Sequence, residues 1–183
     1  MRDRVWIVAG SVCLMWGAAT AAPKKPVAQP KPVVLNGTVS RVVDGDTLWL
    51  KTDAADAHTV VVRLAGIDAP ERCLIGGADA TAALNALALG RSVTVRVAAN
   101  DEYGRTIGKV FDGEKDLGDR MVRDGQAWSS RVRYDRGPYV AAERMALALK
   151  RGLHAAGGAM QPREFRRLHG PCEGDQTKAP GAS

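Results

Sequence analysis

The sequence predicts an α+β fold, a five-stranded OB-type Greek-key β-barrel with three helices. Two observations carry this prediction. Five short segments alternate apolar with polar residues or are rich in β-branched residues, and Gly, Pro or Asp-Gly turn signals bound them. One segment with helical spacing of its apolar residues lies between the third and fourth strands, and two more follow the fifth strand. Five short strands with an inserted helix suit an OB barrel.

The first three strands are expected before the middle of the chain. Residues 37–43 alternate apolar and polar side chains, Asp44-Gly45 is a turn signal, and residues 47–52 resume the strand pattern, which together indicate a hairpin. Residues 58–64 are β-branched and apolar and predict a third strand. Pro70 then prevents simple continuation, so a loop follows this strand.

The remaining elements follow from a change of period. Residues 78–89 carry apolar side chains at helical spacing before a glycine, which predicts a helix. Residues 92–98 and 106–111 return to the strand period. Residues 117–123 and 138–151 read as helices, the second with one apolar stripe along its length.

The two ends of the chain differ in composition from this domain, which we place at residues 34–172. Residues 1–21 combine early arginines, an apolar run and a small-residue exit, the order expected of a secretory signal peptide. A retained membrane anchor is the alternative, although the run is short for one. Residues 22–33 are rich in Pro and Lys and predict an extended tether, and residues 173–183 predict a disordered tail. We therefore expect an exported protein, periplasmic or secreted, with no membrane contact after cleavage.

Charge and cysteine content add two weaker indications. The formal net charge is +6, and a basic protein attracts polyanions such as nucleic acid, although charge alone does not establish binding. After removal of the leader, Cys73 and Cys172 remain, and an even pair in an oxidising compartment predicts one disulfide. Two free or mispaired thiols are the alternative.

Three loops concentrate charged residues beyond what turn geometry requires. They are residues 44–47 (DGDT), residues 63–71 (RLAGIDAPE) and residues 101–105 (DEYGR). Carboxylates at strand ends, as in Asp46 and Asp68, are the ligands that a hard cation such as Ca²⁺ prefers. Arginine suits phosphate because its planar fork grips two oxygens at once. The set indicates hydrolysis of a phosphodiester.

Each of these residues also has a purely structural interpretation. Asp44-Gly45 taken alone is a turn. Asp68 and Glu71 could cap a helix or pair with Arg72, and Arg63 could be part of a structural ion pair. The order and spacing of the whole set argue against these separate explanations.

The stretches VVDGDT, VRLAGIDAPE and YGR, in that order, are similar to the three signature stretches of the staphylococcal (micrococcal) nuclease or thermonuclease family. The resemblance covers roughly residues 38–151. It implies a Ca²⁺-dependent endonuclease that hydrolyses DNA and/or RNA with low sequence selectivity and leaves 3′-phosphate ends. Nucleic acid is then the substrate, and we expect a monomer with no stable protein partner.

The resemblance also assigns metal-binding roles. Asp46 and Asp68 correspond to the carboxylate ligands of Ca²⁺, and Ala69 would offer its backbone carbonyl. The family usually has Thr at the position of Ala69, which matters little because the carbonyl is the ligand. Asp44 would support the metal loop without contacting the ion.

The catalytic and substrate-binding roles are assigned in the same way. Glu71 resembles the residue proposed as general base, and Arg63 and Arg105 would bind the scissile phosphate. Tyr103 would lie near the terminal phosphate of a bound nucleotide. Glu102 departs from the best-known member, which has lysine there.

A second departure lies in the segment QAWSSRVRY. Arg131 and Arg133 stand roughly where the best-known member has tyrosines that contact the nucleotide. We expect weaker stacking and stronger phosphate attraction from these two arginines.

Two other classes of protein remain possible from sequence. A non-catalytic OB-type nucleic-acid-binding module would have lost the metal carboxylates or the phosphate arginines, and all of them are present here. A structural or interaction protein would bind neither Ca²⁺ nor nucleotide. The three histidines do not have the spacing of metal ligands, which disfavours a zinc enzyme.

Overall fold

The computed structural model describes residues 33–131, 135–155, 159–170 and 172. The predicted signal peptide, the tether up to residue 32 and the tail at 173–183 therefore lie outside the described residues. Val33 is described, and its carbonyl accepts a hydrogen bond of 2.9 Å from the amide of Val97. Backbone pairing of the barrel thus begins one residue before the predicted boundary at 34. No helix within the described ranges is long and apolar enough to cross a membrane.

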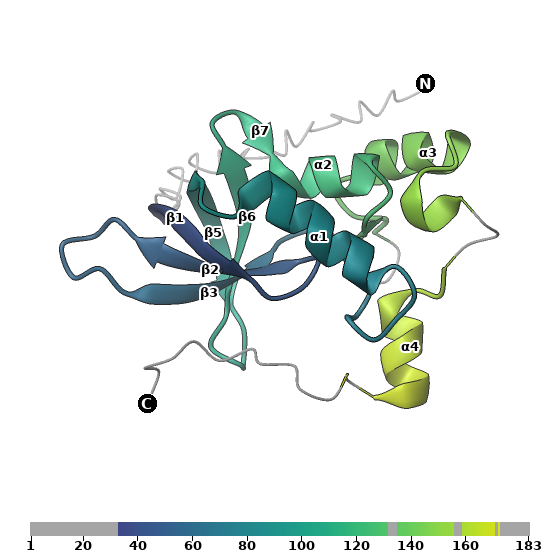
Figure 1. Ribbon diagram of the computed structural model, residues 1–183, viewed down its shortest axis with the longest axis horizontal. Helices are drawn as coiled ribbons and strands as arrows, with labels where there is room; N and C mark the ends of the chain where they lie inside the picture. Colours follow the sequence, from purple (N-terminus) through teal and green to yellow (C-terminus); the bar gives the residue numbers. More distant parts are fainter. Residues whose placement is uncertain (1–32, 132–134, 156–158, 171, 173–183) are drawn as a thin grey trace, which may run out of the picture. The chain divides into compact units, whose positions relative to one another are not determined.

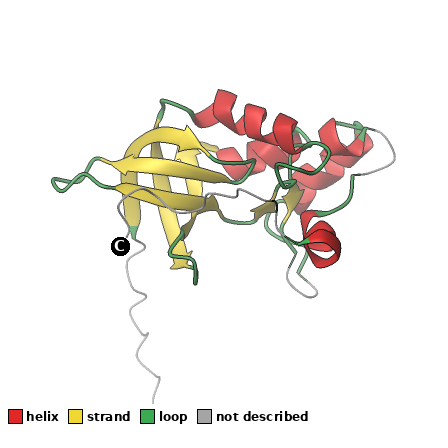
Figure 2. Cartoon of the chain, turned by 60° about the horizontal axis from the view of Figure 1, so that its bottom comes forward, coloured by secondary structure: helices red, strands yellow, loops and turns green. Residues whose placement is uncertain are grey.

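Five strands close into a mixed barrel, which confirms the predicted fold class (Figures 1 and 2). They are β1 (Val34–Val42), β2 (Thr47–Thr52), β3 (Thr59–Leu64), β5 (Ser92–Asn100) and β6 (Thr106–Asp112). Neighbours pair in the order β3-β2-β1-β5-β6, and parallel pairing of β3 with β6 closes the ring. This closure brings together strands that the inserted helix separates along the chain.

Three further strands are only two residues long, and the sequence did not predict them. They are β4 (Ile67–Asp68), β7 (Lys115–Asp116) and β8 (Trp128–Ser129). Two residues carry no detectable period, which explains why sequence patterns missed them. The antiparallel pairing of β4 with β8 has a functional consequence, because it fixes the backbone of Asp68 against Trp128.

The prediction of three helices was wrong by one, because the described part of the chain holds four. They are α1 (Gly77–Ala88), α2 (Leu117–Arg123), α3 (Val140–Ala148) and α4 (Pro162–His169), with a 3₁₀ turn η1 (Gly152–His154). The helix α4 has no continuous apolar stripe, and Pro162 is its one buried residue. Its sequence signal was Pro at the first helical turn.

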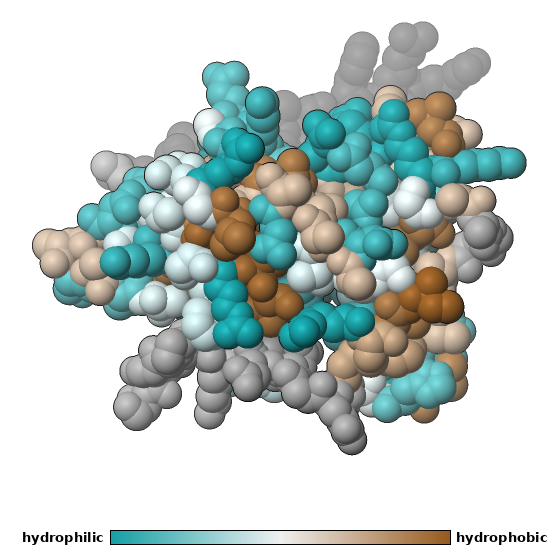
Figure 3. Space-filling model, in the orientation of Figure 1, coloured by the Kyte–Doolittle hydropathy of each residue, from teal (hydrophilic) through white to brown (hydrophobic). Residues whose placement is uncertain are grey.

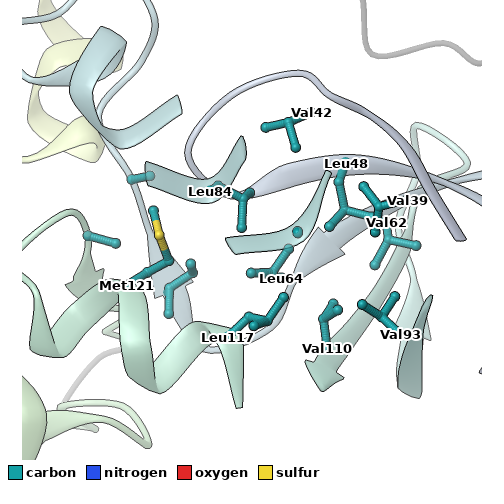
Figure 4. Packing of buried hydrophobic residues seen from close by; sticks show 14 of the residues in the cluster. Val39, Val42, Leu48, Val62, Leu64, Leu84, Val93, Val110, Leu117 and Met121 are labelled. Atoms are coloured by element: carbon teal, nitrogen blue, oxygen red, sulfur yellow. The ribbon is translucent and has the colours of Figure 1, made fainter. Parts of the chain in front are cut away.

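The core fills the barrel and continues beneath α1 and α2 (Figure 4). Leu48 and Val62 point into it from the barrel wall, while Leu84 of α1 and Met121 of α2 reach it from outside. On the face shown in Figure 3, hydrophilic side chains are spread over barrel and helices, with hydrophobic groups between them. The buried side chains hold the strand ends in fixed positions, and the candidate site is built on those ends.

Candidate active site

The turn between β1 and β2 presents Asp46 to the interior of the site. The amide of Asp46 donates to Oδ1 of Asp44 at 2.9 Å, which is the local hydrogen bond expected of an aspartate turn. Asp46 is 4% exposed, and the hydroxyl of Thr47 donates to its Oδ1 at 3.0 Å. Asp44 therefore shapes the loop, and its role beside a metal ion stays a prediction.

Gly45 lets this turn approach the rest of the site closely. A Cβ at Gly45 would lie 2.7 Å from the Cβ atoms of both Ala69 and Ala80. The backbone there is not left-handed, so the obstacle to a side chain is steric. The absence of a side chain thus allows the Asp46 turn to pack on the residues that follow β4.

We predict that Gly45→Ala destabilises the protein by about 1–3 kcal/mol, the usual cost of overpacking a tight contact. The turn must move away from Ala69 and Ala80, which also displaces Asp46. Urea unfolding followed by circular dichroism measures the change. An unchanged midpoint would show that the turn relaxes freely and does not fix Asp46.

Arg63 bridges two carboxylates that are far apart in sequence. It lies on β3 opposite Thr47 of β2. Its Nη1 donates to Oδ1 of Asp46, and its Nη2 donates to Oδ1 of Asp68 at 3.3 Å. The backbone amide of Ala69 donates to the other oxygen of Asp46 at 3.1 Å. The structure thus brings together four of the predicted site residues.

Burial and the neighbouring charges shift the pKa values of Arg63 and Asp68. The negative charge of Asp46 raises the pKa of Arg63 above its ordinary value, so the guanidinium stays charged. Burial raises the pKa of Asp68, and the nearby charge of Asp46 raises it further. The positive charges of Arg166 and Arg63 act in the opposite direction, and the net shift of the pKa of Asp68 is upward.

The donor set fits a hard divalent cation with few protein ligands. Within the described ranges, no group of three or more His, Cys, Asp or Glu side chains is placed to hold a metal ion. Such an ion would take the carboxylates of Asp46 and Asp68, the carbonyl of Ala69, and water. The chemistry of the donor set supports this fit, because carboxylate and carbonyl oxygens are the ligands that a hard cation takes.

Glu71 is held by a residue that sequence reasoning missed. Nη1 of Arg166, on α4, donates to Oε1 of Glu71, and Nη2 of the same side chain approaches Oδ1 of Asp68 at 3.5 Å. Neither Asp68 nor Glu71 caps α1, whose N-cap is Gly76 without a side-chain hydrogen bond. The capping and Arg72-pairing interpretations are therefore replaced by an ion pair with α4.

Cys73 and Cys172 form a disulfide, with their Cα atoms 5.9 Å apart. The bond links the residue two positions after Glu71 to the residue three positions after α4. A predicted disulfide at these positions, together with the arginines of PREFRRLH, was the available signal that α4 returns to the site. Figure 1 shows α4 beside the loop that leads into α1.

Arg105 and Tyr103 lie in the turn between β5 and β6. Nε of Arg105 donates to Asp101 at 2.7 Å, and its guanidinium carbon lies 5.4 Å from the ring centroid of Tyr103. Tyr103 is 65% exposed. The parallel pairing of Arg63 with Ile107 places the start of β6 beside β3. Within the described residues, Arg105 pairs with Asp101, and no hydrogen bond or ion pair links it to Asp46 or Asp68.

Arg131 and Arg133 were expected to stand where the best-known member has nucleotide-contacting tyrosines, and the structure describes only Arg131. Arg131 donates to Oε2 of Glu143 at 2.8 Å, and Glu143 is 2% exposed on α3. This pairing anchors the loop after β8 to α3 and leaves Arg131 partly exposed. Arg133 lies outside the described residues, so its predicted contact with substrate stays a prediction.

Comparisons with known proteins find a family model and named relatives that are similar to this chain. The family model described as "Staphylococcal nuclease homologue" matches residues 61–155. A rice protein (Oryza sativa subsp. japonica) named "probable staphylococcal-like nuclease" is 36% identical over 116 residues, 63% of this chain and 31% of the rice protein. An Escherichia coli protein named ParB is 33% identical over 164 residues, 84% of this chain and 91% of that protein.

A third relative is an uncharacterized endonuclease of Haemophilus influenzae, which is 32% identical over 130 residues, 70% of this chain and 71% of that protein. The chain spans about a third of the length of the three rice relatives. The match to the family model begins within β3 and ends just after η1, so it includes Arg63, the residues around β4 and Arg105.

Proposed function

Because the chain belongs to the staphylococcal nuclease homologue family, we propose that it is an endonuclease that hydrolyses phosphodiester bonds of DNA or RNA with Ca²⁺ as its cofactor. The observation that carries the proposal is the position of Arg63 between Asp46 and Asp68. The side chains of Asp46 and Asp68 are only 6% and 18% exposed, and such clusters of poorly solvated charges gather at functional sites more often than in a passive binding barrel.

The proposed reaction is an in-line attack of water on phosphorus that breaks the bond to the 5′ oxygen, leaving a 3′-phosphate on one product and, after that oxygen takes up a proton, a 5′-hydroxyl on the other. Ca²⁺, when bound, would polarise a phosphate oxygen and favour ionisation of water. Glu71 accepts a proton from the attacking water as general base. Arg63 and Arg105 donate to phosphate oxygens, where negative charge develops in the transition state.

Substrate contacts are proposed to be mainly with the sugar-phosphate backbone, which gives low sequence selectivity. The exposed ring of Tyr103 sits beside Arg105 and is available to lie near a terminal phosphate. We also propose export to the periplasm or the medium, because a disulfide is stable in oxidising compartments. A monomer is the proposed working state.

The direct test is digestion of single-stranded DNA, duplex DNA and RNA with Ca²⁺ or with a chelator. We expect cleavage to require Ca²⁺ and to leave 3′-phosphate ends. Glu71→Gln should lower kcat about 10²- to 10⁴-fold, the usual contribution of general-base catalysis. Lys51→Gln, at an exposed position on β2, serves as a control and should behave as wild type.

The test also separates the alternative functions. Retained binding of nucleic acid without cleavage would contradict the enzyme and favour a non-catalytic binding module. Loss of both Ca²⁺ binding and nucleic-acid binding would favour a structural protein.

A further inference from the structure

The acidic residues of the site alternate with two arginines. Arg63 joins Asp46 to Asp68, and Arg166 joins Asp68 to Glu71. The family signature stretches contain Arg63 but end well before Arg166, which lies outside the residues that the family model matches. Arg166 is therefore a cation that a separate C-terminal element brings to the site.

The carboxylate of Glu71 accepts a hydrogen bond from Arg166. It lies between β4 and α1, outside any helix or strand. Within the described residues, Arg166 is the hydrogen-bonding partner recorded for its carboxylate. A charge-assisted bond to a guanidinium fixes a carboxylate that its own backbone leaves free to rotate.

The placement of α4 depends in turn on few attachments. Pro162 is its one buried residue, and its other side chains are partly or fully exposed. The ion pairs of Arg166 and the disulfide through Cys172, just after α4, are thus the main links between this C-terminal element and residues 68–73. Each of these links joins α4 to the segment 68–73.

We propose that Arg166 is a positioning residue that orients Glu71, and that the Cys73–Cys172 disulfide keeps it there. This inference rests on the proposed function of Glu71. Arg166 acts through Glu71 and the charge it places near Asp68, so its removal should affect the chemical step rather than substrate affinity. Removal of a positive charge beside Asp68 should at the same time strengthen binding of a divalent cation.

The test compares Arg166→Ala, Arg166→Lys and Arg167→Ala in the full exported protein. Arg167 is exposed on the same helix and gives the same change of charge, so Arg167→Ala is the matched control. We expect Arg166→Ala to lower kcat about 10- to 100-fold through misplacement of Glu71, with little change in KM. Arg166→Lys should recover part of kcat, because it restores a cation within reach of Glu71.

A second measurement does not depend on activity. Isothermal titration with Ca²⁺ should show about three- to tenfold tighter binding to Arg166→Ala than to wild type, because a nearby positive charge has been removed. A general disturbance of the site would weaken Ca²⁺ binding instead. Circular dichroism of each variant checks that the barrel stays folded.

A third measurement tests the role of the Cys73–Cys172 disulfide. In a Cys73→Ser/Cys172→Ser background, Arg166→Ala should lower kcat less than about twofold further, because residues that act as a unit are non-additive. An equal loss in both backgrounds would overturn the role of the disulfide.

The remaining outcomes are also decisive. A raised KM with unchanged kcat, or an Arg166→Ala protein that matches Arg167→Ala, would overturn the role of Arg166. If the wild-type protein cleaves no nucleic acid, the proposed function fails by itself. The Ca²⁺ titration then still decides whether Arg166 acts on the carboxylate group, since unchanged affinity would overturn the inference as well.

Discussion

Arg63→Ala is expected to lower kcat about 10²- to 10³-fold, the range measured when one preorganised donor to a transition-state charge is removed. The side chain of Arg63 is 23% exposed, and its guanidinium bridges Asp46 and Asp68, so it is already held in place before substrate binds. Its loss would remove the proposed phosphate-binding group and leave the two carboxylates without the cation that bridges them. Steady-state kinetics on a short DNA substrate at saturating Ca²⁺ measures the effect.

The same variant should also be less stable when Ca²⁺ is absent. Removing one partner of a buried ion pair typically costs about 3–5 kcal/mol, and partial exposure of Arg63 places the expected loss at or below the lower end. Added Ca²⁺ should restore part of it, because a ligand that binds the folded state stabilises that state. Unfolding in urea with Ca²⁺ and with chelator tests this.

Arg91→Ala is the matched control for Arg63→Ala. Arg91 pairs with Asp112 at 3.0 Å on the surface, and such pairs contribute about 0–1 kcal/mol. We expect its kcat to equal that of wild type. If Arg63→Ala behaves like Arg91→Ala in kinetics, the assignment of Arg63 to the phosphate is wrong.

Loss of the disulfide is the second large effect. The Cys73→Ser/Cys172→Ser protein should lose about 2–5 kcal/mol of unfolding free energy, because the bond closes a long loop and restricts the unfolded chain. The sequence separation is 99 residues, so this loop contains α1, β5, β6 and the helices α2 to α4. Urea unfolding of the wild type, with and without dithiothreitol, gives an independent measure of the same quantity.

The reduced wild type and the double serine variant should have the same urea midpoint. Agreement attributes the loss to the covalent link, since serine and a reduced cysteine have similar size. A midpoint that dithiothreitol does not move would show that the bond adds nothing to stability, and that α4 is held by its other contacts.

The sequence determined the barrel because its strands carry strong local signals. Residues 47–52 were predicted as a strand and form β2 with the same bounds. The Asp44-Gly45 turn and the helix that ends before Gly90 are likewise local features, and the structure has both. β-branched alternation and turn residues report on neighbours along the chain, and most of the barrel follows from them.

Tertiary structure decided which charged side chains meet. The sequence placed Asp46, Arg63 and Asp68 in loops and strands, and their motif marked them as a set, but the bridge made by Arg63 follows from β2–β3 pairing and from the β4–β8 pair. The ion pair of Arg166 with Glu71 joins residues 95 positions apart. No local pattern encodes such a contact.

There is a physical reason why the sequence determined some features of this protein and only the tertiary structure decided others. Hydrophobic period and turn chemistry act between residues a few positions apart, so the sequence alone determined the five barrel strands and the first three helices. The order of its charged motifs gave the candidate acids and arginines. The short helix α4, which buries little, takes its position from a disulfide and an ion pair. Interactions between distant segments exist only after the barrel has closed, and for that reason only the tertiary structure could bring Arg166 to Glu71.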